Sequence, residues 1–258
     1  MVALSAAAPV MIPRRIGTEK TQLNRLLAAL PPAELSALTP FLREVSLCRG
    51  TVLHEPGDLI AEVYFPHDAV ISMVGIMQNG ASVETAMIGH EAALGLGAAL
   101  TSRRAVTRAV VQLPGRAARM GAAEFNQAAL ASAVLRELAG RANDLLIAQL
   151  QQSVACNALH SAEARLCRRL LEYSDRADGE LALTQDALAQ AISVRRTTVT
   201  IIAQILQDAG AIRYRRGVIQ VLDRALLEKS SCECYQSLRR QADDLHLHCA
   251  AWSEPKSA

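Results

Sequence analysis

The fold of this chain is decided by residues 184–222, TQDALAQAISVRRTTVTIIAQILQDAGAIRYRRGVIQVL. Val199, Ile202 and Leu206 fall at i, i+3 and i+7, which places them on one side of a helix. Two short runs typical of strands follow this helix, joined by Arg215-Arg216-Gly217. The pattern predicts two short helices with a tight turn between them and then a β-hairpin, the arrangement of a winged helix-turn-helix.

The first helix of the pair supplies the opposing apolar wall. Leu188, Ile192 and Val194 fall where they can pack against the second helix. Thr184 suits the N-cap of the first helix, because its hydroxyl can accept a hydrogen bond from a free backbone N–H. Gly210 suits the position just after the second helix, where a left-handed backbone ends many helices.

The other face of the second helix offers side chains that suit a DNA groove. Arg can donate two hydrogen bonds to guanine, and Thr can contact phosphate or a thymine methyl group. Between Arg195 and Arg216 the chain has five Arg and a single acid, Asp208. The candidate DNA-contacting residues are Arg195, Arg196, Thr197, Thr198, Thr200, Arg213, Arg215 and Arg216. Together they predict a surface that binds double-stranded DNA.

Several short motifs between residues 164 and 235 are more specific than this general pattern. They are Arg165-Leu166, Leu170-Leu171, Gln185, Leu188-Ala189, Arg196-Thr197-Thr198-Val199, Gly210, Ile212, residues 218–223, Leu226 and Cys232-Glu233-Cys234-Tyr235. In these motifs the segment resembles the Crp/Fnr family of bacterial transcription regulators. The resemblance implies that residues 195–197 and Thr200 contact DNA.

Two positions depart from the family pattern. Ser193 occupies the turn where the family usually has Gly, so the turn is expected to adjust. Ile201 stands where many members have an Arg that helps to read the DNA site. An aliphatic side chain cannot make that hydrogen-bonded contact, so we expect the operator sequence to differ from the usual one.

The N-terminal half of the chain changes to a period of two residues with frequent turns. Gln78-Asn79-Gly80 is a strong hairpin signal. Short strands at regular spacing predict a small β-barrel or jelly roll. Residues 23–125 also resemble the cyclic-nucleotide-binding β-roll of the same family. The motifs that carry this resemblance are Gly50-Thr51-Val52-Leu53, Glu55-Pro56-Gly57-Asp58, Tyr64-Phe65 and residues 89–97.

This second resemblance implies an effector pocket in the β-roll. The candidate residues are Gly89, Glu91, Arg103, Arg104 and Arg108. Solvated loop charges are the alternative for the three Arg. In members that bind cyclic AMP, an Arg on a strand neutralises the phosphate, but Thr107 stands at that position here. A displacement by one residue sends Arg108 to the opposite face of its strand, so a cyclic nucleotide is disfavoured and the effector stays open.

Residues 123–159 lack Pro and show helical periodicity. Leu138 and Leu145 lie one heptad apart. Leu135 and Ala142 repeat that spacing. We expect one long helix that pairs two copies of the chain, as in the family, and a helix packed on its own domain is the alternative. A homodimer would place two recognition helices one DNA turn apart, which suits a palindromic operator.

The six Cys are scattered through a chain of ordinary size, which suits reduced thiols in the cytoplasm. Cys48 is the only Cys in the N-terminal half, so no iron–sulfur cluster is expected there. Candidates for a soft-metal site near the C-terminus are Cys232, Cys234, His246, His248 and Cys249. A surface helix and tail without metal is the alternative for these residues.

Composition bounds the remaining possibilities. With 258 residues the chain can hold two domains, each with its own core. The formal net charge of +2 says little, so the local Arg cluster carries the electrostatic argument. No apolar run is long enough to span a membrane. No nucleophile–base pair, phosphate-binding Gly loop or carboxylate pair stands out, so an enzyme is not expected.

These observations predict an α+β protein. Its expected parts are a disordered arm over residues 1–20, a cyclic-nucleotide-binding-like sensory β-roll (jelly roll) over 21–122, a dimerisation helix over 123–159, a winged helix-turn-helix over 160–235 and a C-terminal helix or tail over 236–258. Two functional hypotheses follow. The first is a homodimeric, sequence-specific transcription regulator in the cytoplasm, which would contact RNA polymerase if it is an activator. The second is a small-ligand binding module whose C-terminal domain makes protein contacts instead of DNA contacts.

Overall fold

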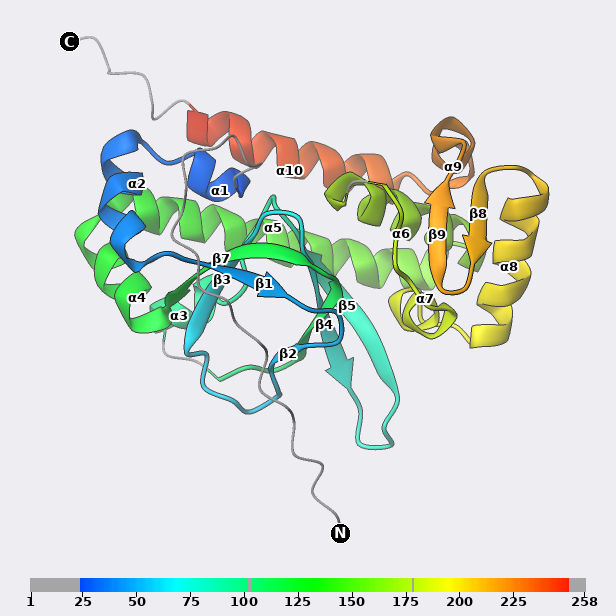
Figure 1. Ribbon diagram of the computed structural model, residues 1–258, viewed down its shortest axis with the longest axis horizontal. Helices are drawn as coiled ribbons and strands as arrows, with labels where there is room; N and C mark the ends of the chain where they lie inside the picture. Colours follow the sequence, from blue (N-terminus) through cyan, green and yellow to red (C-terminus); the bar gives the residue numbers. More distant parts are fainter. Residues whose placement is uncertain (1–23, 102–103, 178, 251–258) are drawn as a thin grey trace.

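The computed structural model describes residues 24–101, 104–177 and 179–250, and the side chains of residues 245–250 are left out of the description. The β-roll lies against one end of a long helix, α5 (Ala133–Leu159), and the helix-turn-helix lies at the other end (Figure 1). The last helix, α10 (Cys234–Ala250), runs back along α5 in the opposite direction (Figure 1). The arm predicted over residues 1–20 lies outside the described residues.

The N-terminal half is a β-roll of two facing antiparallel sheets, as predicted. One sheet has the order β1-β7-β3 and the other β2-β6-β4-β5. Their strands are β1 (Arg43–Leu47), β2 (Val52–His54), β3 (Glu62–Pro66), β4 (Val70–Ile76), β5 (Ser82–Ile88), β6 (Arg108–Leu113) and β7 (Gly115–Gly121). Alternate residues such as Val45, Ile71 and Val111 point between the sheets and are buried. The hairpin signal at residues 78–80 is confirmed, because Gly80 turns between β4 and β5 with a φ of 82°.

Short helices close one end of this roll. They are α1 (Arg25–Ala28), α2 (Pro32–Leu38), the 3₁₀ turn η1 (Thr39–Phe41), α3 (Leu96–Thr101) and α4 (Ala122–Ala131). Asn24 fastens the first of them: its side-chain oxygen accepts from the N–H of Leu26, and its amide donates to the carbonyls of Pro66 and Ala92 at 2.8 Å. A fully buried Asn can hold this place because its polar atoms are bonded.

The single helix expected over residues 123–159 is two helices, which corrects that prediction. The chain breaks at Ser132, where φ is −117° and ψ is 118°. The hydroxyl of Ser132 accepts a hydrogen bond from the N–H of Leu135 at 3.0 Å, so it caps α5. The pattern of apolar residues runs through the break, which is why periodicity alone did not locate it.

The C-terminal domain is the winged helix-turn-helix that the sequence predicts. Its elements are α6 (Ala162–Arg176), α7 (Gln185–Ala191), α8 (Arg196–Asp208), β8 (Ile212–Arg215), β9 (Val218–Val221) and α9 (Arg224–Ser230). Val199, Ile202 and Leu206 are buried as expected. Thr184 caps α7 by accepting from the N–H of Ala187 at 3.2 Å. The helix expected over 236–258 begins earlier, since α10 starts at Cys234.

Two non-Gly residues in this domain have a left-handed backbone. Ser193, in the turn between α7 and α8, has a φ of 54°. Arg216 has a φ of 52° and Gly217 a φ of 78°, so both central residues of the β8–β9 hairpin are left-handed, as in a type I′ turn. In the turn between α7 and α8, Ser193 adopts the left-handed backbone that Gly would adopt freely, at a steric cost of about 1–2 kcal/mol.

A buried ionic cluster joins α6 to the β-roll. Arg169 pairs with Glu172 at 2.9 Å and, across the domain boundary, with Glu84 on β5 at 3.4 Å. Arg168 pairs with Glu172 at 2.8 Å. The hydroxyl of Tyr173 donates to Glu84 at 3.0 Å. All five side chains are buried, so the helix-turn-helix and the β-roll are joined by charges that water does not screen.

Glu172 should make stability depend on acid pH. Burial alone would raise its pKa, but Arg168, Arg169 and Arg176 outweigh burial and lower the pKa to about 2 from an ordinary value of 4.5. A carboxyl with a lowered folded pKa stabilises the protein fully above about pH 4.5, and the effect is lost as pH falls towards 2. We expect Glu172→Gln to lower the free energy of unfolding at neutral pH by about 3–5 kcal/mol in urea titrations.

The control for this variant is Glu137→Gln. Glu137 makes an i,i+4 pair with Arg141 on α5, and its side chain is half exposed. The expected loss there is no more than about 1 kcal/mol. Equal losses in the two variants would contradict the assigned role of the buried cluster.

Ser193→Gly should stabilise the protein. Gly adopts a φ of 54° without the steric cost that a Cβ brings. Part of this stabilisation is offset because Gly makes the unfolded chain more flexible. The expected net gain is about 0.5–1 kcal/mol, seen as a higher midpoint of thermal unfolding. Ser132→Gly should do the opposite, because Ser132 has a negative φ and its hydroxyl caps α5.

Candidate nucleic-acid interface and sensor

The exposed face of α8 carries most of the predicted DNA contacts. Arg195, just before the helix, is exposed, and so are Thr197 and Thr200. The side chain of Arg196 is 64% exposed. Thr198 is half-buried and lies off this face, which makes it the least suited of the predicted contacts. The buried side of α8 fixes the direction in which the exposed face points.

Gln185 at the start of α7 forms hydrogen bonds with two side chains of this face, a role that its position in the sequence does not predict. Its Oε1 accepts hydrogen bonds from Thr200 Oγ1 at 2.9 Å and from Arg196 Nε at 3.3 Å. Arg196 also pairs with the neighbouring Asp186, with 3.5 Å between Nη1 and Oδ2. The first turn of α7 therefore holds the polar side chains of α8 in place, a contact that helix-by-helix analysis could not find.

The hairpin β8–β9 presents the predicted wing. Arg215 and Arg216 are exposed, and Arg213 contacts Gln220 on the neighbouring strand at 3.3 Å. The N–H of Tyr214 donates to Gln207 Oε1 at 2.9 Å, which fastens the wing to α8. The wing and α8 thus form one surface with Arg on both elements.

An apolar stripe interrupts the polar face of α8. The side chain of Ile201 is 63% exposed, and Ile205, one turn further on, is 48% exposed. Ile201 and Ile205 therefore place two apolar side chains one turn apart on a helix face that is otherwise polar.

The predicted effector residues do not come together. Arg108 pairs with Glu55 at 2.8 Å, and Arg104 donates to the carbonyl of Gly57 at 2.7 Å, so both side chains bind the turn at residues 55–58 on the surface. Arg103 lies outside the described residues. The solvated-charge alternative therefore holds for Arg104 and Arg108, because neighbouring loop groups satisfy them.

Glu91, predicted to line an effector pocket, pairs instead with a side chain of α6. It is buried and pairs with Arg176 at the end of α6, with 2.8 Å between Nη2 and Oε1. Burial alone would raise its pKa, and Arg176 reverses this, so the pKa of Glu91 is lowered. Gly89 is needed to make room, since a Cβ there would lie 2.6 Å from the Arg176 side chain. These two residues belong to the domain junction, where they hold α6 against the β-roll.

A cavity of about 250 Å³ adjoins this pair, between the end of β5, α5, α6 and α10. Its lining combines apolar groups such as Met87 and Leu145 with Glu91, Arg176 and Tyr235. This cavity lies at the domain junction instead of inside the β-roll.

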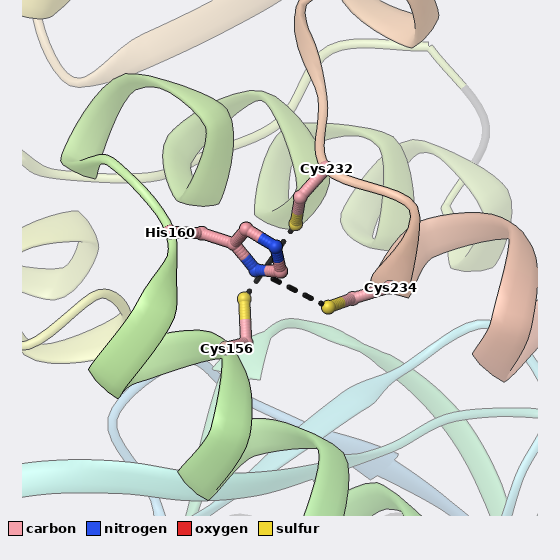
Figure 2. Close-up of side chains that lie close together, drawn as sticks. All are labelled: Cys156, His160, Cys232 and Cys234. Atoms are coloured by element: carbon pink, nitrogen blue, oxygen red, sulfur yellow. Dashed lines mark hydrogen bonds between the residues drawn. The ribbon is translucent and has the colours of Figure 1, made fainter.

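The structure groups the predicted Cys metal ligands with different neighbours from those expected. Cys232 and Cys234 lie together, but their neighbours are Cys156 and His160 at the end of α5 (Figure 2). The side chains of His246, His248 and Cys249 lie outside the described residues. The missed signal is the i,i+4 spacing of Cys156 and His160, which brings both to one side of a helix end.

This group of four side chains shifts the acidity of its thiols. A hydrogen bond from Cys232 lowers the pKa of Cys156 to about 5, and the charge of Arg168 acts in the same direction. By contrast, burial raises the pKa of Cys167, which lies elsewhere in the core, to about 12. The thiols of Cys156 and Cys167 therefore differ strongly in acidity.

Residues 164–230 match the family model of a Crp-like helix-turn-helix domain. The chain contains a Crp-like helix-turn-helix domain. No curated protein matches the sequence. Solved structures with the same fold include FixK2 from Bradyrhizobium japonicum, which is 14% identical with a TM-score of 0.64 over 74% of this chain and 98% of that chain.

Two further structures extend the comparison beyond the Crp-like domain to most of the chain. A putative Crp/Fnr-family transcriptional regulator from Eubacterium rectale is 16% identical, with a TM-score of 0.62 over 83% of this chain and 97% of its own. The c-di-GMP-responsive global regulator CLP of Xanthomonas campestris is 14% identical, with a TM-score of 0.60 over 74% and 99%. The predicted fold, a β-roll followed by a long helix and a winged helix-turn-helix, is confirmed. Within the described ranges, no helix has the length and hydropathy needed to cross a bilayer.

Proposed function

We propose that this protein is a homodimeric, sequence-specific DNA-binding regulator of transcription. The observation that supports this most directly is the exposed Arg and Thr face of α8, flanked by the Arg of the β8–β9 wing on a Crp-like domain. In this arrangement α8 enters the major groove and the wing contacts phosphates. Arg196 reads a guanine, and Thr197 and Thr200 contact phosphate or thymine.

Ile201 changes the base recognition that we propose for α8. It is exposed on the same helix as Arg196 and Thr200, where a major-groove base edge would lie. An aliphatic side chain contacts the methyl group of thymine and offers nothing to guanine or cytosine. We infer a thymine at this position of the operator in place of the base that an Arg would read.

Arg196→Ala should weaken binding to the selected operator by about 1–3 kcal/mol, roughly 5- to 150-fold, and relax the preference at one base pair. Arg216→Ala should weaken binding to all sequences alike and reduce the salt dependence of the affinity by about one counterion, because it removes a phosphate contact. Both are measured by fluorescence anisotropy on operators obtained by DNA selection.

The control is Arg116→Ala, since Arg116 is an equally solvated Arg that pairs with Asp68 on the β-roll. It should leave the affinity for DNA unchanged. If Arg196→Ala and Arg216→Ala also bind as the unchanged protein does, the C-terminal domain makes protein contacts and the DNA-binding proposal is wrong.

A dimer contact through α5 would use a different face of the helix from the one that the heptad spacing predicts. Leu135, Leu138 and Ala142 are buried against the chain's own β-roll, so they cannot form a seam between copies. The exposed apolar side chains on α5 include Ile147, 43% exposed, and Val154, 72% exposed, one heptad apart. We propose that this face packs on the same face of a second copy.

Val154→Glu should convert the dimer into a monomer, because it places a charge in an apolar seam around the twofold axis. Light scattering on the purified protein measures the mass directly, and binding to a palindromic operator should weaken with it. Leu130→Glu, equally exposed at 73% but on α4, should leave the dimer intact. A dimer that persists in Val154→Glu would place the interface elsewhere.

A signal in the β-roll would reach the DNA-binding domain through the junction on α6. The contacts Glu84–Arg169 and Glu91–Arg176 join the two parts directly. We infer that an effector acts by altering these contacts and thus the position of α8. The relative CLP is described as responsive to c-di-GMP, but Arg104 and Arg108 are engaged by the turn at residues 55–58 here, so we propose no nucleotide for this chain.

A further inference from the structure

Four side chains that can bind a soft metal meet where the DNA-binding domain joins α5. Cys156 lies in the last turn of α5, and His160 is the residue that ends this helix. Cys232 and Cys234 come from the other end of the domain, at the start of α10 (Figure 2). The sulfur atoms and a ring nitrogen of His160 all lie within 4.8 Å of one another. The three thiols are buried.

The spacing of these atoms fits a tetrahedral centre. With Zn–S bonds of about 2.3 Å and Zn–N bonds of about 2.0–2.1 Å, the edges of the tetrahedron are about 3.8 Å between sulfurs and about 3.6 Å between sulfur and nitrogen. Here 3.6 Å separates the sulfurs of Cys156 and Cys232, and 3.5 Å separates Cys234 Sγ from His160 Nδ1. Only small side-chain adjustments would bring all four ligand atoms onto one ion.

The surroundings also have the form of a metal site. His160 directs Nδ1 at the thiols, while its Nε2 lies 3.2 Å from the carboxylate of Glu233. A carboxylate on the far nitrogen orients most metal-binding His. The side-chain amide of Gln152 donates to Cys234 Sγ at 2.9 Å. The buried Arg168 places a positive charge near the thiols, which offsets the net negative charge of a zinc ion with three thiolates.

We propose that Cys156, His160, Cys232 and Cys234 bind one Zn²⁺ ion in a closed tetrahedral site. Three thiolates and an imidazole select Zn²⁺ over hard cations, and four protein ligands leave no position for a substrate. The site is therefore structural. It ties the end of α5 to the start of α10, so that the two chain segments entering and leaving the DNA-binding domain are fixed together.

The first test measures metal in the full-length protein, purified without chelator and under reducing conditions. Elemental analysis should find one zinc per chain. Removal with a chelator and titration with Co²⁺ should give the absorption of a tetrahedral cobalt–thiolate centre, which Zn²⁺ then displaces. A protein that binds neither ion, that binds iron instead, or that carries a Cys156–Cys232 disulfide under these conditions would overturn the proposal.

Variants test the ligand assignment. Cys156→Ser and Cys234→Ser should lose the bound zinc, while Cys48→Ser and Cys167→Ser should keep it, because those two thiols lie outside the cluster. Zinc retained in Cys156→Ser and Cys234→Ser would contradict the site. Circular dichroism identifies any variant that fails to fold.

Glu233→Gln keeps the test independent of folding, since Glu233 is exposed and its side chain can change without disturbing the core. The loss of the carboxylate on His160 should weaken zinc binding about 10- to 100-fold in a competition titration with a chelator. An unchanged affinity would contradict the role assigned to Glu233 in orienting His160. DNA binding is measured separately, so failure of the zinc site and failure of the proposed regulator function are distinguishable.

Discussion

The arrangement of the whole chain depends on the buried charges of α6. Arg169 lies between Glu172 on its own helix and Glu84 on the β-roll, in a place that water does not reach. Breaking such a pair leaves an uncompensated charge in a medium of low dielectric constant, which costs several kcal/mol. The relative position of the β-roll and the helix-turn-helix domain is therefore set by a few specific contacts, and moving one part against the other would break them at a high cost in free energy.

The junction also explains the positions of Gly89 and Glu91. His90 separates Glu91 from Gly89 in the sequence, and Glu91 pairs with Arg176 at the end of α6. Gly89 provides the space for that Arg, so its lack of a side chain serves packing between domains. The adjoining cavity is bounded by both domains. A ligand in this cavity would contact both domains directly.

How much could be predicted from the sequence depended on how local each signal is. The helix-turn-helix and its wing follow from Thr184, Gly217 and the apolar spacing of Val199, Ile202 and Leu206, all within one short segment. The heptad spacing of Leu135 and Leu138 serves packing on the chain's own β-roll, and periodicity alone does not identify the surface against which a helix packs. The Cys and His cluster joins residues more than 70 positions apart, so only half of it was recognised.

The antiparallel course of α10 along α5 has a consequence for how DNA is bound. The DNA-binding domain begins at the end of one helix and finishes at the start of the other, so both of its connections attach to the same place on the same pair of helices (Figure 1). A domain held at two adjacent points turns about one axis, whereas a domain on a single flexible linker explores many orientations. The orientational entropy of α8 is then lost when the protein folds, and little remains to be lost when it meets the groove.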